Sequence, residues 1–353
     1  QRKLMPARAP AAPGEPGGEF RRQQIRAVAD SRGRRRRTMV TGNHNNAFGE
    51  NAMTSMFRND LMKGKRILVT GGGTGLGREM ADEFAMLGAE VVICGRRGNV
   101  LEETAKEISG KRGVRVTPIT CDIRVPEAVD DMVAEAFAGG TINGLVNNAA
   151  GNFISRTKDL SPRGFNAISD IVFRGSFYTT LACGKRWIEG KTKANVVSIL
   201  TTWVWNGGPF TVPSAMSKAG INVMTKSLAV EWAPHGIRLN AIAPGPFPTK
   251  GAWDRLNPGG ARENSMGSIE DSSAASNPMG RVGQMQELRN LAVFLMADGV
   301  DYLTGETIAI DGASFLAGGG NFSQLAKLGD PEWDAIRTMI RSSNEKDKAQ
   351  RSV

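Results

Sequence analysis

The chain has 353 residues, enough to bury the core of one large α/β domain. Its formal net charge of +10 suggests a polyanionic partner, but residues 1–52 hold eleven Arg and Lys residues against four acidic ones, so the rest carries only +3. Two histidines and three dispersed cysteines argue against a metal site, a histidine triad or a disulfide framework, and no apolar run has membrane-spanning length.

Residues 1–58 are predicted to be a disordered basic tail. They are rich in Pro, Gly and Arg and contain too few large apolar residues to form a core. The run Arg34 to Arg37 resembles a nucleic-acid or nuclear-import patch, and the segment as a whole could be an organelle leader. Its low serine content and its prolines favour a solvated tail instead, or sequence upstream of the true start, because Met53 and Met56 lie just before the first predicted strand. We expect no nucleic-acid partner.

The three cysteines, Cys94, Cys121 and Cys183, lie far apart in apolar runs and are expected to be buried thiols in a reducing compartment. We expect a cytoplasmic protein of bacterial type, or one of an organelle matrix if the tail is a leader.

Folded structure is predicted to begin with an apolar run, Arg66 to Val69, followed by Thr70-Gly71-Gly72-Gly73-Thr74-Gly75-Leu76-Gly77 and then an amphipathic segment. This order indicates a strand, a glycine turn and a helix. Such a turn points backbone N–H groups and the positive end of the helix at one place, where a pyrophosphate can bind. Glycine is required because a Cβ atom would block the turn or hold the phosphates away.

Short apolar runs alternate with helical patterns along residues 65–313. The runs are apolar on both faces, as in parallel strands covered by helices. We predict an α/β, three-layer Rossmann fold with a doubly wound, parallel, seven-stranded sheet. The predicted strands are Ile67–Val69, Val91–Cys94, Val114–Ile119, Gly144–Val146, Asn195–Leu200, Arg238–Ile242 and Thr307–Ile310.

Helix ends and loops are predicted from capping residues and composition. Ser161 and Pro162 should begin an amphipathic stretch that continues to Trp187, and Gly110 and Gly236 should end helices. Residues 59–353 are expected to form one Rossmann-type domain. Within it, a polar loop at about 250–283 is expected to be a substrate lid, followed by a C-terminal extension at about 314–353.

The second predicted strand ends in Cys94-Gly95-Arg96-Arg97, without an acidic residue to accept from a ribose hydroxyl. A planar guanidinium binds a 2′-phosphate in a bidentate way, so Arg96 and Arg97 favour NADP(H) as the cofactor. Two solvated arginines after a strand are the alternative interpretation.

Further motifs follow the glycine turn in a fixed order: Asp122, Asn147-Asn148-Ala149-Ala150-Gly151, Ser214 with Lys218, and Pro244-Gly245. Together they resemble the short-chain dehydrogenase/reductase family over about Lys65 to Ala313. Other segments are similar to 2,4-dienoyl-CoA reductases of the mitochondrial type. These are Asn152-Phe153, Val212-Pro213-Ser214-Ala215, Lys218-Ala219-Gly220, Pro244-Gly245-Pro246, Thr249-Lys250-Gly251-Ala252 and the tail Phe322 to Ile340.

The resemblance implies a role for each matching residue. Asp122 would contact the adenine, Lys218 the nicotinamide ribose, Asn152 and Phe153 the acyl thioester, and Arg255 the phosphates of CoA. The full set of implied cofactor-binding residues is Gly71, Gly72, Gly73, Thr74, Gly75, Leu76, Gly77, Arg96, Arg97, Asp122, Ile123, Asn148, Ala149, Lys218, Pro244, Gly245, Pro246, Phe247 and Thr249.

The catalytic tyrosine of the family is missing. Classical members place it four residues before the lysine, where this chain has Ser214, and dienoyl-CoA reductases place it fifteen before, where this chain has Trp203. An indole donates a hydrogen bond but does not serve as an acid. We expect Trp203, with Asn152 or Ser214, to polarise a thioester while Lys218 orients the cofactor; alternatively, Trp203 only packs in the pocket wall.

The sequence therefore predicts an NADPH-dependent reductase of an unsaturated acyl-CoA, most simply a 2,4-dienoyl-CoA in fatty-acid β-oxidation. Another enoyl-CoA or carbonyl reductase, or a catalytically silent NADP-binding protein, is the alternative. Apolar helices around Asp170 to Trp187 and Ser214 to Trp232 predict a homo-oligomer, and the resemblance implies a homotetramer.

Overall fold

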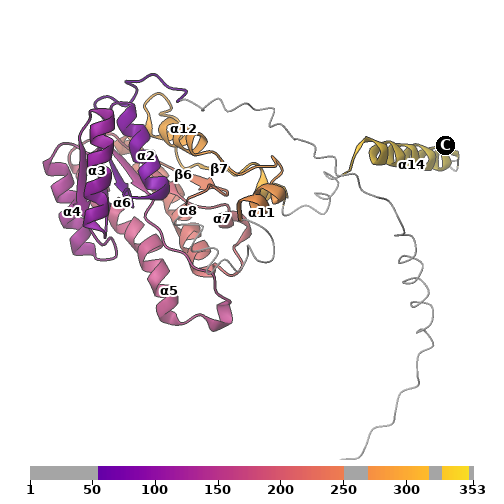
Figure 1. Ribbon diagram of the computed structural model, residues 1–353, viewed down its shortest axis with the longest axis horizontal. Coiled ribbons are helices and arrows are strands. Elements are labelled where there is room, and N and C mark those ends of the chain that lie inside the picture. Colours follow the sequence, from indigo (N-terminus) through magenta and orange to yellow (C-terminus); the bar gives the residue numbers. More distant parts are fainter. Residues whose placement is uncertain (1–54, 250–268, 318–327, 350–353) are drawn as a thin grey trace, which may run out of the picture. The chain divides into compact units, whose positions relative to one another are not determined.

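The structure, a computed structural model, describes residues 55–249, 269–317 and 328–349 (Figure 1). The chain divides into two units, residues 1–52 and 53–353, and every described residue belongs to the second. Most of the predicted tail, with Arg34 to Arg37, lies outside the described residues. Phe57, which the prediction assigned to the tail, packs against the core, so the folded unit begins before residue 59.

The seven strands form one parallel sheet in the order β3-β2-β1-β4-β5-β6-β7, which confirms the predicted fold class. The chain leaves β1 in one direction along the sheet and returns to its other side at β4. A crevice for a ligand forms at such a reversal, beyond the carboxyl ends of the strands. The strands are β1 (Arg66–Thr70), β2 (Glu90–Gly95), β3 (Val116–Thr120), β4 (Gly144–Asn147), β5 (Ala194–Ile199), β6 (Ile237–Pro244) and β7 (Thr307–Ile310).

Helices cover both faces of the sheet. Ile67 and Val69 of β1 pack with α2 (Gly75–Met86), α3 (Gly98–Arg112) and α12 (Met285–Met296) in one hydrophobic core. Leu68 faces the opposite way and packs with α4 (Pro126–Ala138), α6 (Gly175–Glu189) and α8 (Val212–Trp232) in the other. The shorter or peripheral elements are η2 (Thr157–Asp159), α5 (Pro162–Ser169), η3 (Asp170–Arg174), α7 (Trp203–Asn206), η4 (Ala233–His235), α11 (Ile269–Ser276), α13 (Ser314–Ala317) and α14 (Asp330–Ala349).

Two of the three predicted helix ends are confirmed. The Ser161 hydroxyl accepts a hydrogen bond from the Gly164 N–H at 3.1 Å, and Gly236 follows η4 in the left-handed conformation. The prediction at Gly110 was wrong: α3 continues to Arg112 and ends at Gly113, whose φ of 70° is the conformation that glycine adopts without strain. The stretch to Trp187 is also interrupted, by the π-turn of η3.

The predicted lid contains a helix in the part that the structure describes. Residues 250–268 lie outside the described residues, but α11 replaces the expected loop at Ile269–Ser276. Glu270 and Asp271 lie in its first turn, where carboxylates interact favourably with the helix dipole.

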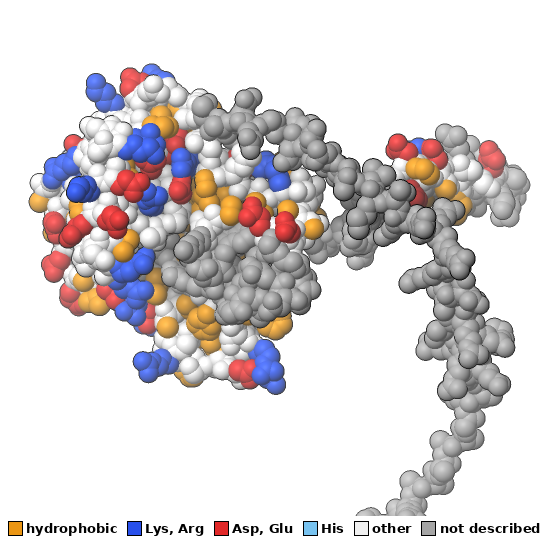
Figure 2. Space-filling view, viewed as in Figure 1, with side chains coloured by type: hydrophobic (Ala, Val, Ile, Leu, Met, Phe, Trp, Pro, Cys, Tyr) orange, Lys and Arg blue, Asp and Glu red, His pale blue; other side chains and the backbone are white. Residues whose placement is uncertain are grey.

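Acidic and basic side chains are interspersed over the face that carries α3 and α4, as Figure 2 shows. Mixed charge of this kind is typical of a solvated surface and gives no field of one sign for a polyanion. Within residues 55–249, 269–317 and 328–349, no helix is both long and apolar enough to cross a membrane.

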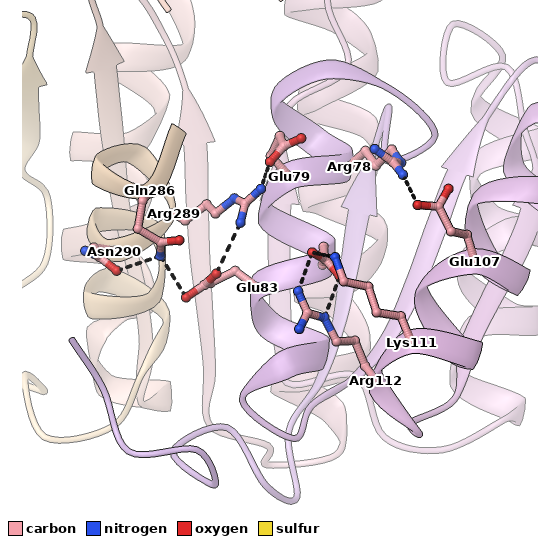
Figure 3. Close-up of polar contacts among 10 residues, drawn as sticks. Arg78, Glu79, Glu83, Glu107, Lys111, Arg112, Gln286, Arg289 and Asn290 are labelled. Atoms are coloured by element: carbon pink, nitrogen blue, oxygen red, sulfur yellow. Dashed lines mark hydrogen bonds and ion pairs between the residues drawn. The ribbon is translucent and has the colours of Figure 1, made fainter. Parts of the chain in front are cut away.

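A polar cluster joins α2 to α12 across one face of the sheet (Figure 3). Arg289 on α12 pairs with Glu79 and approaches Glu83 Oε2 at 3.7 Å, while Gln286 donates to Glu83 Oε1 at 3.0 Å. The Glu83 side chain is fully buried, so its charge depends on these two partners. Arg78, on the same helix α2, pairs instead with Glu107 of α3 near the surface.

Arg289→Met is expected to lower the free energy of unfolding by about 3–5 kcal/mol, because it leaves a buried carboxylate without its cation. Arg78→Met removes a more accessible pair and should cost less than about 1 kcal/mol. Urea denaturation of both variants measures the difference. Equal losses would show that the pairing of Glu83 does not control the packing of α2 on α12.

Candidate active site

A cleft of about 1140 Å³ lies at the carboxyl ends of the strands. It brings together most of the residues predicted to bind cofactor or substrate, although they come from six different strand ends and the helices that follow. The predicted residues that line it are Gly71, Gly73, Thr74, Gly75, Leu76, Arg96, Arg97, Asp122, Ile123, Asn148, Ala149, Asn152, Trp203, Ser214, Lys218, Pro244, Gly245, Pro246, Phe247 and Thr249.

The glycine turn has the conformation that its sequence predicts. Gly71 and Gly75 have φ angles of +66° and +57°, and a Cβ atom on Gly75 would meet no other atom within 4 Å, so the backbone here borders open space. Gly75 is also the first residue of α2. A turn with free space beside a helix N-terminus suits a phosphate group.

Gly72 and Gly77 serve the same turn from behind. A Cβ atom on Gly72 would lie 2.6 Å from Ile93 Cγ2, and one on Gly77 would lie 2.4 Å from Asn148 Nδ2. Neither residue lines the cleft. Because these glycines lack a side chain, β2 and the residues that follow β4 can pack closely against the turn.

Thr70, the last residue of β1, connects the glycine turn to the exit from β4. Its hydroxyl oxygen accepts from the backbone N–H groups of Asn148 and Ala149, both at 3.0 Å. The Asn148 side chain in turn donates to the Thr70 carbonyl at 2.9 Å. Sequence analysis gave Thr70 no role, although a hydroxyl residue directly before a glycine turn was a signal that could have been used.

One end of the cleft is cationic. Arg96 and Arg97 are exposed there, and Arg97 lies within 3.5 Å of the Thr74 hydroxyl of the glycine turn. Arg124, which sequence analysis missed, donates to both carboxylate oxygens of Asp122 at 2.9 and 3.0 Å. These hydrogen bonds hold the pKa of Asp122 below its usual range, so the carboxylate is ionised at neutral pH.

The other end holds Asn152, Trp203, Ser214 and Lys218. Ser214 and Lys218 lie one turn apart on α8, and Lys218 Nζ donates to the Leu200 carbonyl at 2.8 Å. Enclosure of the ammonium group lowers the pKa of Lys218 to about 8. A buried cation at this position offers a fixed positive charge to an anionic transition state.

No tyrosine lines the cleft. Tyr178, on α6, packs against the core, and Tyr302 is fully exposed in the loop before β7. Trp203 therefore lies in the cleft without a phenol beside it. Its ring packs on Gly208, where a Cβ atom would come within 2.9 Å of the indole.

Phe153, the predicted substrate residue that the structure describes, does not line the cleft. Phe153 packs with a small core formed by Ile168, Val172, Leu200 and neighbours, and Arg255 lies outside the described residues. Conversely, sequence analysis missed Ser273 and Ser276 of α11 and Asp311 and Ser314 after β7, all of which line the cleft. No cluster of His, Cys, Asp and Glu suited to a metal ion occurs in the part of the chain that the structure describes.

Comparisons with known proteins agree with this geometry. Residues 71–313 match the family model described as enoyl-(acyl carrier protein) reductase. A probable 2,4-dienoyl-CoA reductase, (3E)-enoyl-CoA-producing, of Caenorhabditis elegans is 43% identical over 307 residues, which cover 83% of this chain and 95% of the relative.

Two solved structures share the fold. A short chain dehydrogenase from Bacillus anthracis is 39% identical with a TM-score of 0.63, covering 72% of this chain and 97% of its own. A variant of actinorhodin polyketide ketoreductase with NADPH is 28% identical with a TM-score of 0.66, covering 71% and 97%. The chain belongs to the short-chain dehydrogenase/reductase family and is an oxidoreductase.

The low pKa of Lys218 makes stability depend on pH. Between about pH 8 and 10.5 the folded protein has released a proton that the unfolded chain still binds, so the free energy of unfolding rises with pH in this window. We expect wild type to gain at most about 3 kcal/mol there relative to Lys218→Met, and Lys218→Arg to show no such gain. Urea denaturation at a series of pH values measures it, and parallel curves for all three proteins would contradict it.

Proposed function

We propose that the protein uses NADPH to reduce a 2,4-dienoyl-CoA thioester to an enoyl-CoA. The observation that carries the proposal is a single cleft that joins two kinds of site. A glycine turn and two arginines line one end, and a lysine, hydrogen-bond donors and the indole of Trp203 line the other, where no tyrosine is present. The relative named as a 2,4-dienoyl-CoA reductase supports the substrate class.

The chain's residues fit a phosphorylated dinucleotide. Gly75 leaves open space beside the backbone at the start of α2 for a pyrophosphate, and Arg96 and Arg97 line the same cleft. No carboxylate occupies the end of β2 to repel a 2′-phosphate or to accept from a ribose hydroxyl. Lys218, at the opposite end, would hold the ribose next to the nicotinamide.

The polar groups near Lys218 suit a conjugated thioester. NADPH, when bound, supplies a hydride, which would add to the far end of the diene and move negative charge onto the thioester oxygen. Asn152, Ser214 and Trp203 line the cleft and could each donate a hydrogen bond to that oxygen, and the charge of Lys218 lowers the cost of the anion. A proton from water then completes the reduction at carbon, so no tyrosine is required.

A second candidate is supported by the missing phenol. A protein without the acid of its family could bind NADPH without turning over any substrate, as a sensor or a scaffold. Binding of NADPH without oxidation across a panel of acyl-CoA thioesters would identify this function.

The exposed apolar side chains of η3, α6 and α8 support a homo-oligomer. Phe173 and Phe177 are each 42% exposed, and Met216, Val223 and Val230 are 57–79% exposed. Large apolar side chains gathered on neighbouring helices are typical of a surface that another protein covers. We propose that copies of this chain associate through these helices, as a tetramer.

Purified protein is expected to oxidise NADPH in the presence of a 2,4-dienoyl-CoA. Trp203→Phe should lower kcat by about 100-fold if the indole N–H donates to the thioester oxygen, the size of effect found for loss of one such donor. Trp203→Tyr restores a donor and should recover much of the rate. Equal rates for wild type and Trp203→Phe would limit Trp203 to packing, and no turnover by wild type would refute the proposed reaction.

Cofactor choice is tested by removing the two arginines after β2. The double variant Arg96→Ala and Arg97→Ala should raise KM for NADPH by about 10- to 100-fold, because it loses charge-assisted hydrogen bonds to the 2′-phosphate. KM for NADH should change little and serves as the internal control. An equal increase in KM for NADPH and for NADH would show that the arginines do not recognise the 2′-phosphate.

A further inference from the structure

A stacked aromatic pair lies beside the reacting end of the cleft. Trp205 of α7 and Phe315 of α13 stack with ring centroids 4.7 Å apart and planes inclined by 25°. Each belongs to an element that also lines the cleft: Trp203 lies two residues before Trp205, and Ser314 directly precedes Phe315. The pair therefore adjoins residues that line the cleft, although neither ring lines it.

This wall leaves apolar surface open to water. Trp205 is 43% exposed, and Leu316, next to Phe315, is 65% exposed. Covering exposed tryptophan and leucine side chains with an apolar group removes apolar surface from water and so favours binding of that group. We call Trp205, Phe315 and Leu316 the aromatic rim.

The two segments that carry the aromatic rim are free of charge. Residues 201–214 and the described residues 312–317 contain no Asp, Glu, Lys or Arg, whereas these types make up 23% of the whole chain. These two segments offer no cation to a phosphate or carboxylate, so the surface that they form suits an alkyl group rather than the nucleotide part of CoA.

We propose that the aromatic rim binds the distal alkyl chain of the acyl-CoA, beyond the reacting diene, and sets a preference for longer chains. The inference rests on the proposed function for the identity of the ligand. With the thioester near Asn152 and Ser214, a longer chain leaves the cleft along Trp203 and covers Trp205 and Phe315. A short chain ends before it reaches them.

Calorimetric binding of saturated acyl-CoAs tests this without turnover. Between octanoyl-CoA and dodecanoyl-CoA, wild type should bind roughly twofold more tightly for each added methylene, against about fourfold for complete burial. Trp205→Ala, and independently Leu316→Asn, should remove most of this dependence while leaving butanoyl-CoA affinity unchanged. Tyr302→Ala is the matched control. Tyr302 is also an exposed aromatic residue, but it precedes β7, whereas the cleft and the aromatic rim lie where the strands end.

The outcomes separate this inference from the proposed reaction. The same chain-length dependence in wild type and in both rim variants would overturn the inference even if dienoyl-CoA is reduced. If wild type and Tyr302→Ala show the chain-length dependence and both rim variants lose it, the inference is supported. This holds even if no dienoyl-CoA is reduced, because that result would refute only the proposed reaction. A change of sedimentation coefficient in Trp205→Ala, without a change in chain-length dependence, would overturn it by assigning the rim to contact between copies.

Discussion

The hydroxyl of Thr70 is the contact on which the cleft depends. It lies where the parallel sheet reverses direction, and it accepts hydrogen bonds from the two backbone groups that follow β4. Asn148 returns a hydrogen bond to the Thr70 carbonyl. Because the glycine turn begins at the next residue, this junction sets the distance between the phosphate end of the cleft and the residues that follow β4. Glycine is needed at position 77 because the Asn148 side chain of this junction leaves no room for a Cβ atom there.

The two ends of the cleft differ in how they handle charge. At one end, arginines lie near the surface and Asp122 is held ionised by Arg124. At the other, a single ammonium group is enclosed and its pKa falls to about 8. A solvated cation attracts a phosphate and loses little hydration when the protein folds. An enclosed cation loses its hydration on folding, which lowers stability, but it interacts strongly with negative charge that develops beside it. This division suits a dinucleotide, in which the pyrophosphate separates the adenosine half from the half that carries the reacting ring.

Buried charge is handled in a second way between α2 and α12. Glu83 is fully buried, but Arg289 and Gln286 face it, so the cluster is largely compensated within itself. Within residues 55–249, 269–317 and 328–349, the Lys218 ammonium group donates to the Leu200 carbonyl and forms no ion pair. A compensated pair stabilises helix packing, while an uncompensated cation lowers stability and is retained where it can act on a ligand. The contrast supports a functional role for Lys218.

Local sequence patterns determined the strands, the glycine turn and the replacement of the expected tyrosine by Trp203, because each depends on neighbouring residues and on backbone conformation. The same patterns misplaced the end of α3, since a glycine inside a helix costs only about 1 kcal/mol and Gly113 provided the left-handed turn. Tertiary structure alone decided the Thr70 junction, the enclosure of Lys218 and the stacking of Trp205 on Phe315. Residues 110 positions apart in the chain meet in that stack only because the sheet brings the ends of β5 and β7 to the same edge, which no local pattern encodes.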